Sequence, residues 1–380
     1  MAGVLLVANW KSDVGYAWWL MENFWVQLSV MAEGRGIKSE LIYPEIRTIP
    51  ETIEKSPIEI HTLNYGQNTL AGFLGLARFI LKYRIAYIYL TDKPFFSLKY
   101  LMLRTLGVRR IIVHDHSPGE RTTSSGVKHL IKCVMNALPW VTADAIIAVT
   151  PYVKNRHVNL LCVPARKSRL VTNGISPIGR DPALRYYCHD LFGLPHDAIV
   201  VLTTARASRY KQIDFVIRCA DVLLNRDRIE RVYFVYCGDG PDMTRLHDLA
   251  QSLHLEDHFL FAGNRTDVTK IAQSCDIGFH PSKGEVGYSL SILEYMSAGL
   301  ATVLSDNPSV CGATRDGQTG VLYRENVLES ACDALRRLIA DDDLRRRLGT
   351  AAGAAVASDY PIEKTNREFT EVVSSVFFQR

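Results

Sequence analysis

A stretch near residue 290 combines residue types that suit the binding of an anion and of hydroxyl groups. The segment KGEVGYSLSILEYMSAGL (283–300) holds Glu285, then Gly287 and the small Ser289, and then an apolar run that contains Glu294. A helix that begins near Ser289 would direct its free N–H groups and its positive dipole end at an anion such as a diphosphate. Glu294 would then lie about one and a half turns into the helix. Its carboxylate either contacts a hydroxyl-bearing ligand or occupies an exposed stripe of the helix.

Two cations follow a predicted strand in the same half of the chain. The run AIVVLTTA (198–205) precedes Arg206, and Lys211 opens a helix five positions later. This pair suits a phosphate site, because Arg binds oxygens bidentately and Lys supplies a point charge. A solvated helix start explains the same residues. Gly238 in YCGDGPDM begins a turn that either approaches a ligand or only joins a strand to a helix, since no third glycine follows at the dinucleotide-binding spacing.

Histidine and cysteine spacing gives no metal site. His114 and His116 in VHDH share one face of a predicted strand, but no third ligand lies nearby in the sequence. The eight cysteines are never closer than eighteen positions, so the chain has no Cys-x-x-Cys motif. We therefore expect reduced thiols, no metal and no cofactor.

The elements that must position these residues follow a regular alternation. Short apolar or β-branched runs alternate with segments long enough for helices, which predicts parallel sheets with crossover helices. The pattern weakens between about Asn173 and Asp197 and then restarts, so we expect two doubly wound α/β domains. Beyond about residue 325 we expect consecutive helices, with Pro361 as a break. The predicted strands are VLLVA (4–8), AYIYL (86–90), RIIVH (110–114), AIIAVT (145–150), AIVVLTTA (198–205), RVYFVYCGDG (231–240), HFLFAG (258–263), DIGFHP (276–281) and ATVLSD (301–306).

Charge is distributed unevenly along the 380 residues. Residues 1–190 carry 23 Lys/Arg against 14 Asp/Glu, a net charge of +9, and the remainder has a net charge of −5. A basic half suits an anionic partner such as a membrane surface, a phosphorylated lipid or nucleic acid, and a solvated basic face is the alternative. The aromatic stretch GYAWWLMENFWVQL (15–28) fits a domain that rests on an anionic leaflet, unless these rings pack in the core.

The expected location follows from two further features of the sequence. The first apolar run, VLLVA, has no basic region before it and no small-residue cleavage site after it, and no long uncharged apolar run occurs. We expect a cytoplasmic protein, with a peripheral position on the inner face of the membrane as a further option.

Together, the order and spacing of these motifs resemble the retaining glycosyltransferases of family 4. That resemblance implies the GT-B fold, in which two Rossmann-like domains face each other across a cleft and C-terminal helices cross back to the first domain. It is more specific in the second half of the chain than in the first. The segments that carry it are IIVHDH (111–116), AIIAVTPYV (145–153), RLVTNGI (169–175), Arg206 with Lys211, GDGP (238–241), AGNRTDV (262–268), CDIGFHPS (275–282), the two glutamates before AGL, and DGQTGVLY (316–323).

The resemblance assigns domains and roles by position. It implies an acceptor-side domain at 1–178, joined by a C-terminal helix at about 361–380, and a donor-binding domain at 179–360. Arg206 and Lys211 would neutralise the diphosphate, Glu294 would hold the ribose, and Glu285 and His114 would contact the transferred sugar. The predicted catalytic residues are His114, Arg206, Lys211 and Glu285. The predicted donor-binding residues are Gly15, Arg206, Lys211, Gly238, Gly287, Tyr288, Ser289, Leu290 and Glu294.

Three positions depart from the family pattern. Eight residues separate Glu285 from Glu294, where the family usually has seven. Gln212 stands where glycine is usual, and the loop after the first strand keeps only Gly15 of a commonly glycine-rich turn. The sugar site and the acceptor side are the regions that these departures affect.

The implied activity is transfer of a sugar, without a metal, from a nucleotide-sugar donor to a glycan or lipid-linked acceptor in cell-surface polysaccharide biosynthesis, with no nucleic-acid partner. Nine helical positions span about 13 Å, whereas a double displacement needs carboxyl groups about 5–5.5 Å apart, so we expect front-face transfer. A nucleotide-sugar epimerase and a non-catalytic nucleotide-sugar-binding protein are the alternatives.

Overall fold

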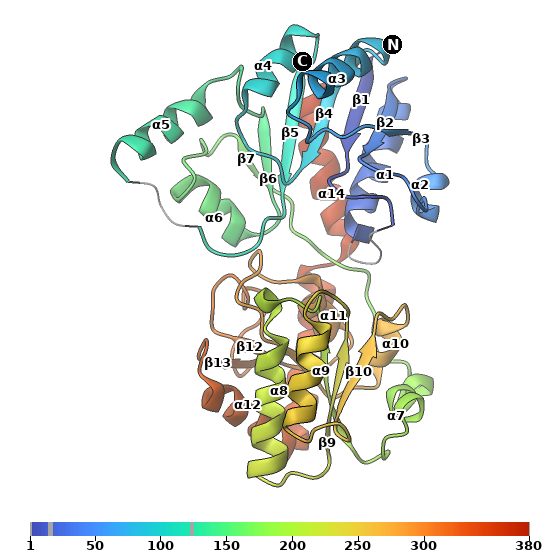
Figure 1. Ribbon diagram of the computed structural model, residues 1–380, viewed down its shortest axis with the longest axis vertical. Helices are drawn as coiled ribbons and strands as arrows, with labels where there is room; N and C mark the ends of the chain where they lie inside the picture. The colour runs from blue at the N-terminus through green and yellow to red at the C-terminus, as the bar shows by residue number, and fades with distance from the viewer. Residues whose placement is uncertain (1, 14–17, 122–124, 380) are drawn as a thin grey trace. The chain divides into compact units, whose positions relative to one another are not determined.

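The chain divides into two compact units, each built on its own sheet (Figure 1). The computed structural model describes residues 2–13, 18–121 and 125–379. Unit 1 comprises Met1–Ser117, Arg121–Thr172 and Glu363–Arg380, and unit 2 comprises Pro118–Glu120 and Asn173–Ile362. The change of unit at Thr172 lies shortly before the predicted boundary after residue 178.

Unit 1 contains a seven-stranded parallel sheet in the order β3-β2-β1-β4-β5-β6-β7. The order reverses between β1 and β4, and the central strand β1 is buried along its whole length, as a sheet covered on both faces requires. The predicted doubly wound parallel sheet is therefore confirmed for this unit. The strands are β1 (Gly3–Val7), β2 (Lys38–Tyr43), β3 (Ile58–Thr62), β4 (Ile85–Thr91), β5 (Arg110–Asp115), β6 (Ala145–Ala148) and β7 (Ser168–Leu170).

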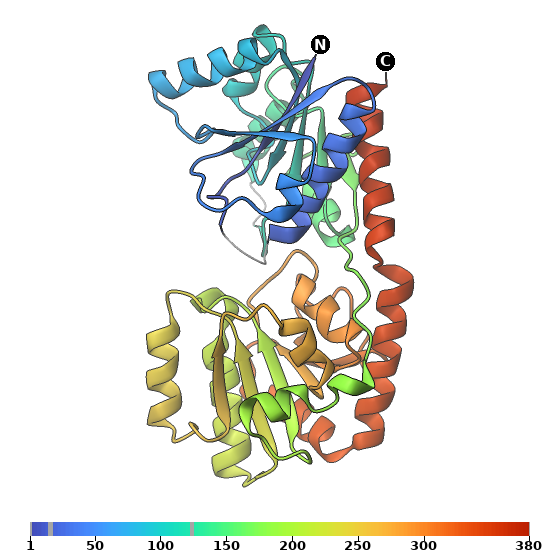
Figure 2. The same cartoon turned by 90° about the vertical axis from the view of Figure 1, so that its right-hand side faces the viewer.

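Helices from both ends of the chain pack together in unit 1. The C-terminal helix α14 runs alongside α1, as Figure 2 shows, and Asn23 Nδ2 donates to Asn366 Oδ1 at 2.7 Å. The Phe24 and Phe369 rings lie 4.7 Å apart, so apolar packing supports the same pairing. The helices are α1 (Trp19–Glu33), α2 (Glu51–Glu54), α3 (Leu70–Lys82), α4 (Leu98–Thr105), α5 (Gly126–Ala137), α6 (Pro151–Asn159) and α14 (Ile362–Val373), which continues as the π-helical turn η5 (Ser374–Phe378).

The described part of the aromatic stretch, residues 18–28, contributes to the core of unit 1. Phe24 and Trp25 are buried in α1, and the Trp25 ring stacks on Trp18 at 6.3 Å. Trp18 and Trp19 are half-buried. The prediction that this stretch faces a membrane is therefore wrong for Phe24 and Trp25, because the side of α1 that carries them covers the sheet.

Unit 2 contains a six-stranded parallel sheet in the order β10-β9-β8-β11-β12-β13. The order reverses between β8 and β11, whose carboxyl ends therefore lie side by side. The strands are β8 (Ile199–Thr204), β9 (Val232–Cys237), β10 (Phe259–Gly263), β11 (Ile277–His280), β12 (Ala301–Ser305) and β13 (Gly320–Tyr323). The helices and turns are η2 (Pro182–Leu184), α7 (Tyr187–Phe192), η3 (Arg209–Lys211), α8 (Ile213–Asp221), η4 (Val222–Arg226), α9 (Met243–Ser252), α10 (Val268–Gln273), α11 (Leu290–Ser297), α12 (Leu328–Ala340) and α13 (Asp342–Asp359).

Gly238 lets two loops at the carboxyl edge of this sheet touch. A Cβ at Gly238 would overlap the carbonyl oxygen of Ala205, and Ala205 N donates to the Cys237 carbonyl at 3.3 Å. Ala207 N donates to the Asp239 carbonyl at 2.9 Å. The turn after β9 therefore supports the loop after β8, which carries Arg206, and glycine is required for this close approach.

We expect Gly238→Ala to lower the free energy of unfolding by about 1–3 kcal/mol, because the added methyl group forces the two loops apart. Urea denaturation measures this loss. Gly353→Ala is the matched control in the same unit, since Gly353 lies within α13 and a Cβ there would meet its nearest atom, the Met296 carbonyl oxygen, at 3.5 Å. That substitution should be neutral or stabilising by up to about 1 kcal/mol. Equal losses in both variants would contradict the packing role of Gly238.

Candidate functional site

The carboxyl ends of β8 and β11 bring together segments that are far apart in the sequence. The loop after β8 carries Arg206 and Lys211, and the loop after β11 carries Glu285 and leads into α11. Ligands of open α/β sheets bind outside the carboxyl ends of the strands, where the strand order reverses. This edge of unit 2 is therefore the candidate site.

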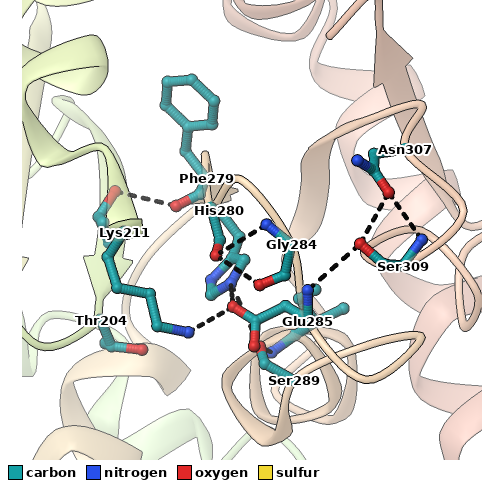
Figure 3. A network of polar contacts seen from close by, with 12 residues as sticks. Thr204, Lys211, Phe279, His280, Gly284, Glu285, Ser289, Asn307 and Ser309 are labelled. Carbon is teal, nitrogen blue, oxygen red and sulfur yellow. Dashed lines mark hydrogen bonds and ion pairs between the residues drawn. The ribbon is translucent and has the colours of Figure 1, made fainter. Parts of the chain in front are cut away.

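Glu285 is the centre of the candidate site, because two other side chains converge on its carboxylate (Figure 3). Lys211 Nζ forms an ion pair with Glu285 Oε1, and His280 Nε2 lies 2.8 Å from the same oxygen. Glu285 and His280 are buried, whereas the Lys211 side chain is 24% exposed. The ammonium group therefore satisfies a buried carboxylate and still reaches solvent.

The contacts of Glu285 determine its charge. Burial alone would raise the pKa of this carboxyl, but the Lys211 charge and the His280 hydrogen bond outweigh burial and lower it to about 2. Burial lowers the pKa of His280, against the opposing effect of Glu285. Near neutral pH the carboxylate is therefore ionised and the imidazole is neutral, with its Nε2–H donating to Glu285. His280 Nδ1 has no hydrogen-bond partner among the described residues.

The segment after β12 holds the β11–α11 loop in place. Glu285 N donates to Ser309 Oγ at 3.3 Å, and Gly287 N donates to the Ser309 carbonyl at 2.7 Å. Ser309 Oγ donates in turn to Asn307 Oδ1 at 2.7 Å. Gly287 has a φ of 110°, a conformation that suits glycine, and its carbonyl accepts from Gly312 N at 2.7 Å. The backbone around Glu285 is thus fixed on both sides.

Helix α11 begins at Leu290, which confirms the start predicted near Ser289. Ser289 caps the helix, with its Oγ accepting from Ile292 N at 3.3 Å. Glu294 is the fifth helical residue and is only 6% exposed, so the exposed-stripe interpretation is wrong. Tyr295 OH lies 2.8 Å from Thr204 Oγ1, which ties α11 to the end of β8.

The other predicted residues of unit 2 occupy the same edge in different environments. Arg206 is exposed, with no hydrogen bond or ion pair in the described part of the chain. Tyr288 is buried and its hydroxyl donates to the Asn173 carbonyl at 2.8 Å, while Leu290 is half-buried. Gly238 packs against the Ala205 carbonyl in the loop that carries Arg206, as described above.

His114 is the next-to-last residue of β5 in unit 1 and is buried among aromatic rings. Its Nδ1 lies 2.5 Å from Tyr89 OH, and its ring lies 4.8 Å from Phe24 and 4.2 Å from His116. Burial lowers the pKa of His114 well below its usual value, so the imidazole is neutral near pH 7. Its Nε2 has no hydrogen-bond partner among the residues that the structure describes. Gly15 lies outside the described residues.

Sequence reasoning missed His280, Asn307 and Ser309. His280 was visible only as the next-to-last residue of the predicted strand DIGFHP (276–281), five positions before Glu285. Asn307 and Ser309 follow the next strand of the sheet, β12, and no motif marks them. Their part in the site depends on which strands are neighbours, which a single sequence does not show.

Two Rossmann-like parallel sheets with a C-terminal segment that returns to unit 1 define the GT-B class of fold. Residues 21–177 match the model of Glycosyltransferase Family 4, and residues 190–354 match that of Glycosyl transferases group 1. The chain therefore belongs to the glycosyltransferases of group 1 and family 4, as the motifs indicated.

Individual relatives agree with this assignment. The chain is 29% identical over 221 residues to a D-inositol 3-phosphate glycosyltransferase of Stackebrandtia nassauensis, an alignment that covers 56% of this chain and 49% of that protein. The chain spans about half the length of the curated relatives it matches.

Solved structures support the fold. A glycosyltransferase from Rickettsia africae superposes with a TM-score of 0.80 at 15% identity, covering 100% of this chain and 99% of that one. HepE of Anabaena, in complex with UDP-glucose, superposes with a TM-score of 0.75 at 17% identity, covering 99% of this chain and 100% of that one. At these identities the likeness shows the GT-B fold.

We expect the pH dependence of stability to reveal the lowered pKa of Glu285. Because this pKa is about 2 when folded and about 4.3 when unfolded, the stabilisation is complete above about pH 5 and is lost as the pH falls toward 2. Between pH 5 and pH 3 this group should account for a loss of about 1.5 kcal/mol, which Glu285→Gln should lack. Urea denaturation at both pH values measures the difference.

The exposed Glu256 provides the control, since Glu256→Gln should keep the wild-type dependence. If Glu285→Gln lost as much stability as the wild type between pH 5 and pH 3, Glu285 would not carry the lowered pKa.

Proposed function

We propose that this protein is a retaining glycosyltransferase that moves a sugar from a nucleotide-sugar donor to a glycan or lipid-linked acceptor. The observation that carries the proposal is the convergence of Lys211 and His280 on Glu285, next to the exposed Arg206 and the start of α11. Family membership supports it, as does the UDP-glucose complex of HepE, a protein with the same fold.

In this proposal the diphosphate binds at the carboxyl edge of unit 2. Arg206 is exposed and Lys211 is partly exposed, so both can reach phosphate oxygens, and the N–H groups of Tyr288 to Leu290 at the start of α11 add donors. Departure of the nucleoside diphosphate develops negative charge, which fixed cations and a helix terminus stabilise. No metal is needed for that step.

The two glutamates take different parts in the proposal. Glu294 lies near the start of α11 and holds the ribose, while Glu285 accepts a hydrogen bond from the transferred sugar. A carboxylate with a pKa of about 2 is a weak base and a weak nucleophile, and its Lys211 ion pair reduces its reactivity further. Glu285 is therefore suited to orient the sugar, which favours front-face transfer over a covalent intermediate.

His114 is the predicted contact to the sugar from unit 1. The neutral ring keeps its Nδ1 on Tyr89, and Nε2 is the nitrogen that remains for a sugar hydroxyl. The surface after β1 suits the acceptor, since Trp10 is 56% exposed there and lies beside Trp18 and Glu22 around a small hollow. Indole faces provide flat apolar surface for sugar rings.

An anionic membrane surface is the proposed partner of unit 1, and α5 is the element that supports it. Its apolar side chains at i, i+3, i+4 and i+7 form one face, which we call the α5 stripe, and this face is exposed. The stripe comprises Val127 (72% exposed), Leu130 (64%), Ile131 (57%) and Val134 (51%). Lys128 and Lys132 lie on the same helix, and the first 190 residues carry a net charge of +9.

An exposed apolar stripe with a basic rim fits an anionic leaflet, which would place the enzyme beside a lipid-linked precursor of a cell-surface polysaccharide, peripherally on the cytoplasmic face. Among the described residues, the helices are too short or too polar to cross a bilayer.

We expect Arg206→Ala and Lys211→Ala each to lower turnover of the donor about 10²–10³-fold, because each removes charge that stabilises the departing diphosphate. The assay uses the donor identified by thermal stabilisation with a panel of UDP-, GDP-, dTDP- and ADP-sugars. Arg218→Ala is the control, since Arg218 is exposed on α8 of the same unit. Wild-type turnover in both site variants would contradict the diphosphate assignment.

The NMR spectrum of the fresh product decides between the candidate functions. A glycoside with the anomeric configuration of the donor supports retaining transfer, whereas inversion contradicts it. An isomerised sugar formed without acceptor would indicate an epimerase, and donor binding without turnover would indicate a binding protein.

We expect the protein to bind vesicles that contain anionic lipid more strongly than neutral vesicles, and less strongly as salt is added. Leu130→Gln with Ile131→Gln should reduce binding at least 10-fold, because it removes two of the most exposed apolar groups of the α5 stripe. Leu191→Gln in unit 2 is the control, since Leu191 is 39% exposed. Vesicle co-sedimentation measures binding, and equal binding to both kinds of vesicle would contradict the proposal.

A further inference from the structure

Helix α5 has the reverse of the usual amphipathic arrangement. Its apolar stripe faces outward, whereas His129, Cys133 and Asn136, at i, i+4 and i+7, are half-buried or buried. Lys132 and Met135 are the other half-buried residues of this helix. Asn136 is the only residue of α5 that is buried, and its Nδ2 donates to the Leu161 carbonyl at 2.7 Å. Figure 1 shows α5 as an outer helix of unit 1, next to α6. Apolar packing therefore contributes little to holding α5.

Three metal-ligating side chains meet on this inward face. His129 and Cys133 come from α5, and Cys162 comes from the segment after α6. Their ligand atoms all lie within 4.8 Å of one another, and all three residues are half-buried. Cys162 Sγ lies 3.4 Å from His129 Nδ1 and 3.6 Å from Nε2.

The sulfur–nitrogen separation matches that of two ligands around one tetrahedral ion. With Zn–S of about 2.3 Å and Zn–N of about 2.0–2.1 Å, tetrahedral angles place a sulfur and a nitrogen ligand about 3.6 Å apart and two sulfurs about 3.8 Å apart. Thiolate and imidazole are the ligands that zinc prefers over harder cations. The three side chains therefore need only small adjustments to share an ion.

We propose that His129, Cys133 and Cys162 form a zinc site that fastens α5 to unit 1, with solvent at the fourth position. His129 and Cys133 lie one helical turn apart on α5, and Cys162 lies on the segment after α6. A shared ion would therefore link two elements that have few apolar contacts with each other. The site would replace the packing that α5 lacks on its inward face and would leave the α5 stripe outward. It does not rest on the proposed glycosyl transfer, since its residues are not among those assigned to the donor or the sugar.

Other contacts of the inward face fit this role. Lys167 Nζ donates to the Asn136 carbonyl at 3.4 Å, so the end of α5 is held by hydrogen bonds to the segment that carries Cys162. The cluster lies one and two turns before Asn136, where the Cys162 thiol contacts the imidazole and the carbonyl of His129 and the side chain of Cys133. An ion bound by His129 and Cys133 would add a second attachment of α5 to unit 1, beside the hydrogen bonds of Asn136.

Titration of the reduced, metal-free protein with Co²⁺ tests the site, because cobalt bound to thiolates in a tetrahedral site gives intense visible and near-ultraviolet absorption that Zn²⁺ abolishes on displacing it. We expect one equivalent to bind. Cys133→Ser, Cys162→Ser and His129→Asn should each weaken binding at least 10-fold. Cys311→Ser is the matched control, since Cys311 is a half-buried free cysteine in unit 2.

A second readout separates metal binding from loss of fold. Zn²⁺ should raise the thermal midpoint of the wild type and of Cys311→Ser but not of Cys133→Ser, while the metal-free midpoints of all three remain close. Stabilisation by the nucleotide sugar should persist in Cys133→Ser, so failure of this proposal is distinguishable from failure of the proposed activity.

Two results would overturn the zinc site. One is absence of the cobalt spectrum in the reduced protein, or a spectrum that the three substitutions leave unchanged. The other is a Cys133–Cys162 disulfide found by non-reducing peptide mapping together with no metal binding after reduction, which would make the two thiols a redox pair.

Discussion

The candidate site depends on one buried carboxylate that two neighbours share. An ionised carboxyl group is costly to bury unless it is paired and hydrogen-bonded, and Glu285 meets both conditions through Lys211 and His280. The three residues come from the loop after β8, the end of β11 and the β11–α11 loop. Their interaction therefore holds these segments of unit 2 at the sheet edge where the proposed donor binds. Ser309 secures the same loop from its backbone side.

Close backbone packing around Gly238 supports the Lys211–Glu285 interaction indirectly. The loop that carries Arg206 rests on Gly238, and Tyr295 of α11 is bonded to Thr204 at the end of β8. Lys211 can reach Glu285 only if β8, its loop and α11 keep this mutual position. Glycine at position 238 is consequently needed whether or not it contacts a ligand. The cations act only where the backbone places them, so Gly238 affects the site through backbone geometry.

The outer helix α5 of unit 1 is not held by the burial of an apolar face. Most helices bury an apolar face, but α5 directs its apolar stripe outward and its polar residues inward. The stripe favours a partner outside the protein, and the inward His129 and Cys133 require some other means of attachment. The proposed membrane contact accounts for the exposed α5 stripe, and the proposed zinc site accounts for the attachment of the inward face. The two proposals are independent of each other.

The sequence by itself determined two doubly wound α/β units, nine of their strands, the family, and the roles of Arg206, Lys211, Glu285 and Glu294 as predictions, because alternating apolar runs and short motifs are local in the chain. It did not identify the outer strands β2, β3, β7 and β13. Strands β7 and β13 have only three and four residues, and the other two carry the charged Lys38, Glu40 and Glu59. Packing decided the orientation of two helices. Helix α1 has Phe24 and Trp25 in the core, and α5 has its apolar stripe outward. An amphipathic pattern alone does not predict what each face of a helix contacts. Tertiary structure alone brought His280, Asn307 and Ser309 to Glu285, and Cys162 to His129 and Cys133, since such contacts depend on which strands and helices become neighbours.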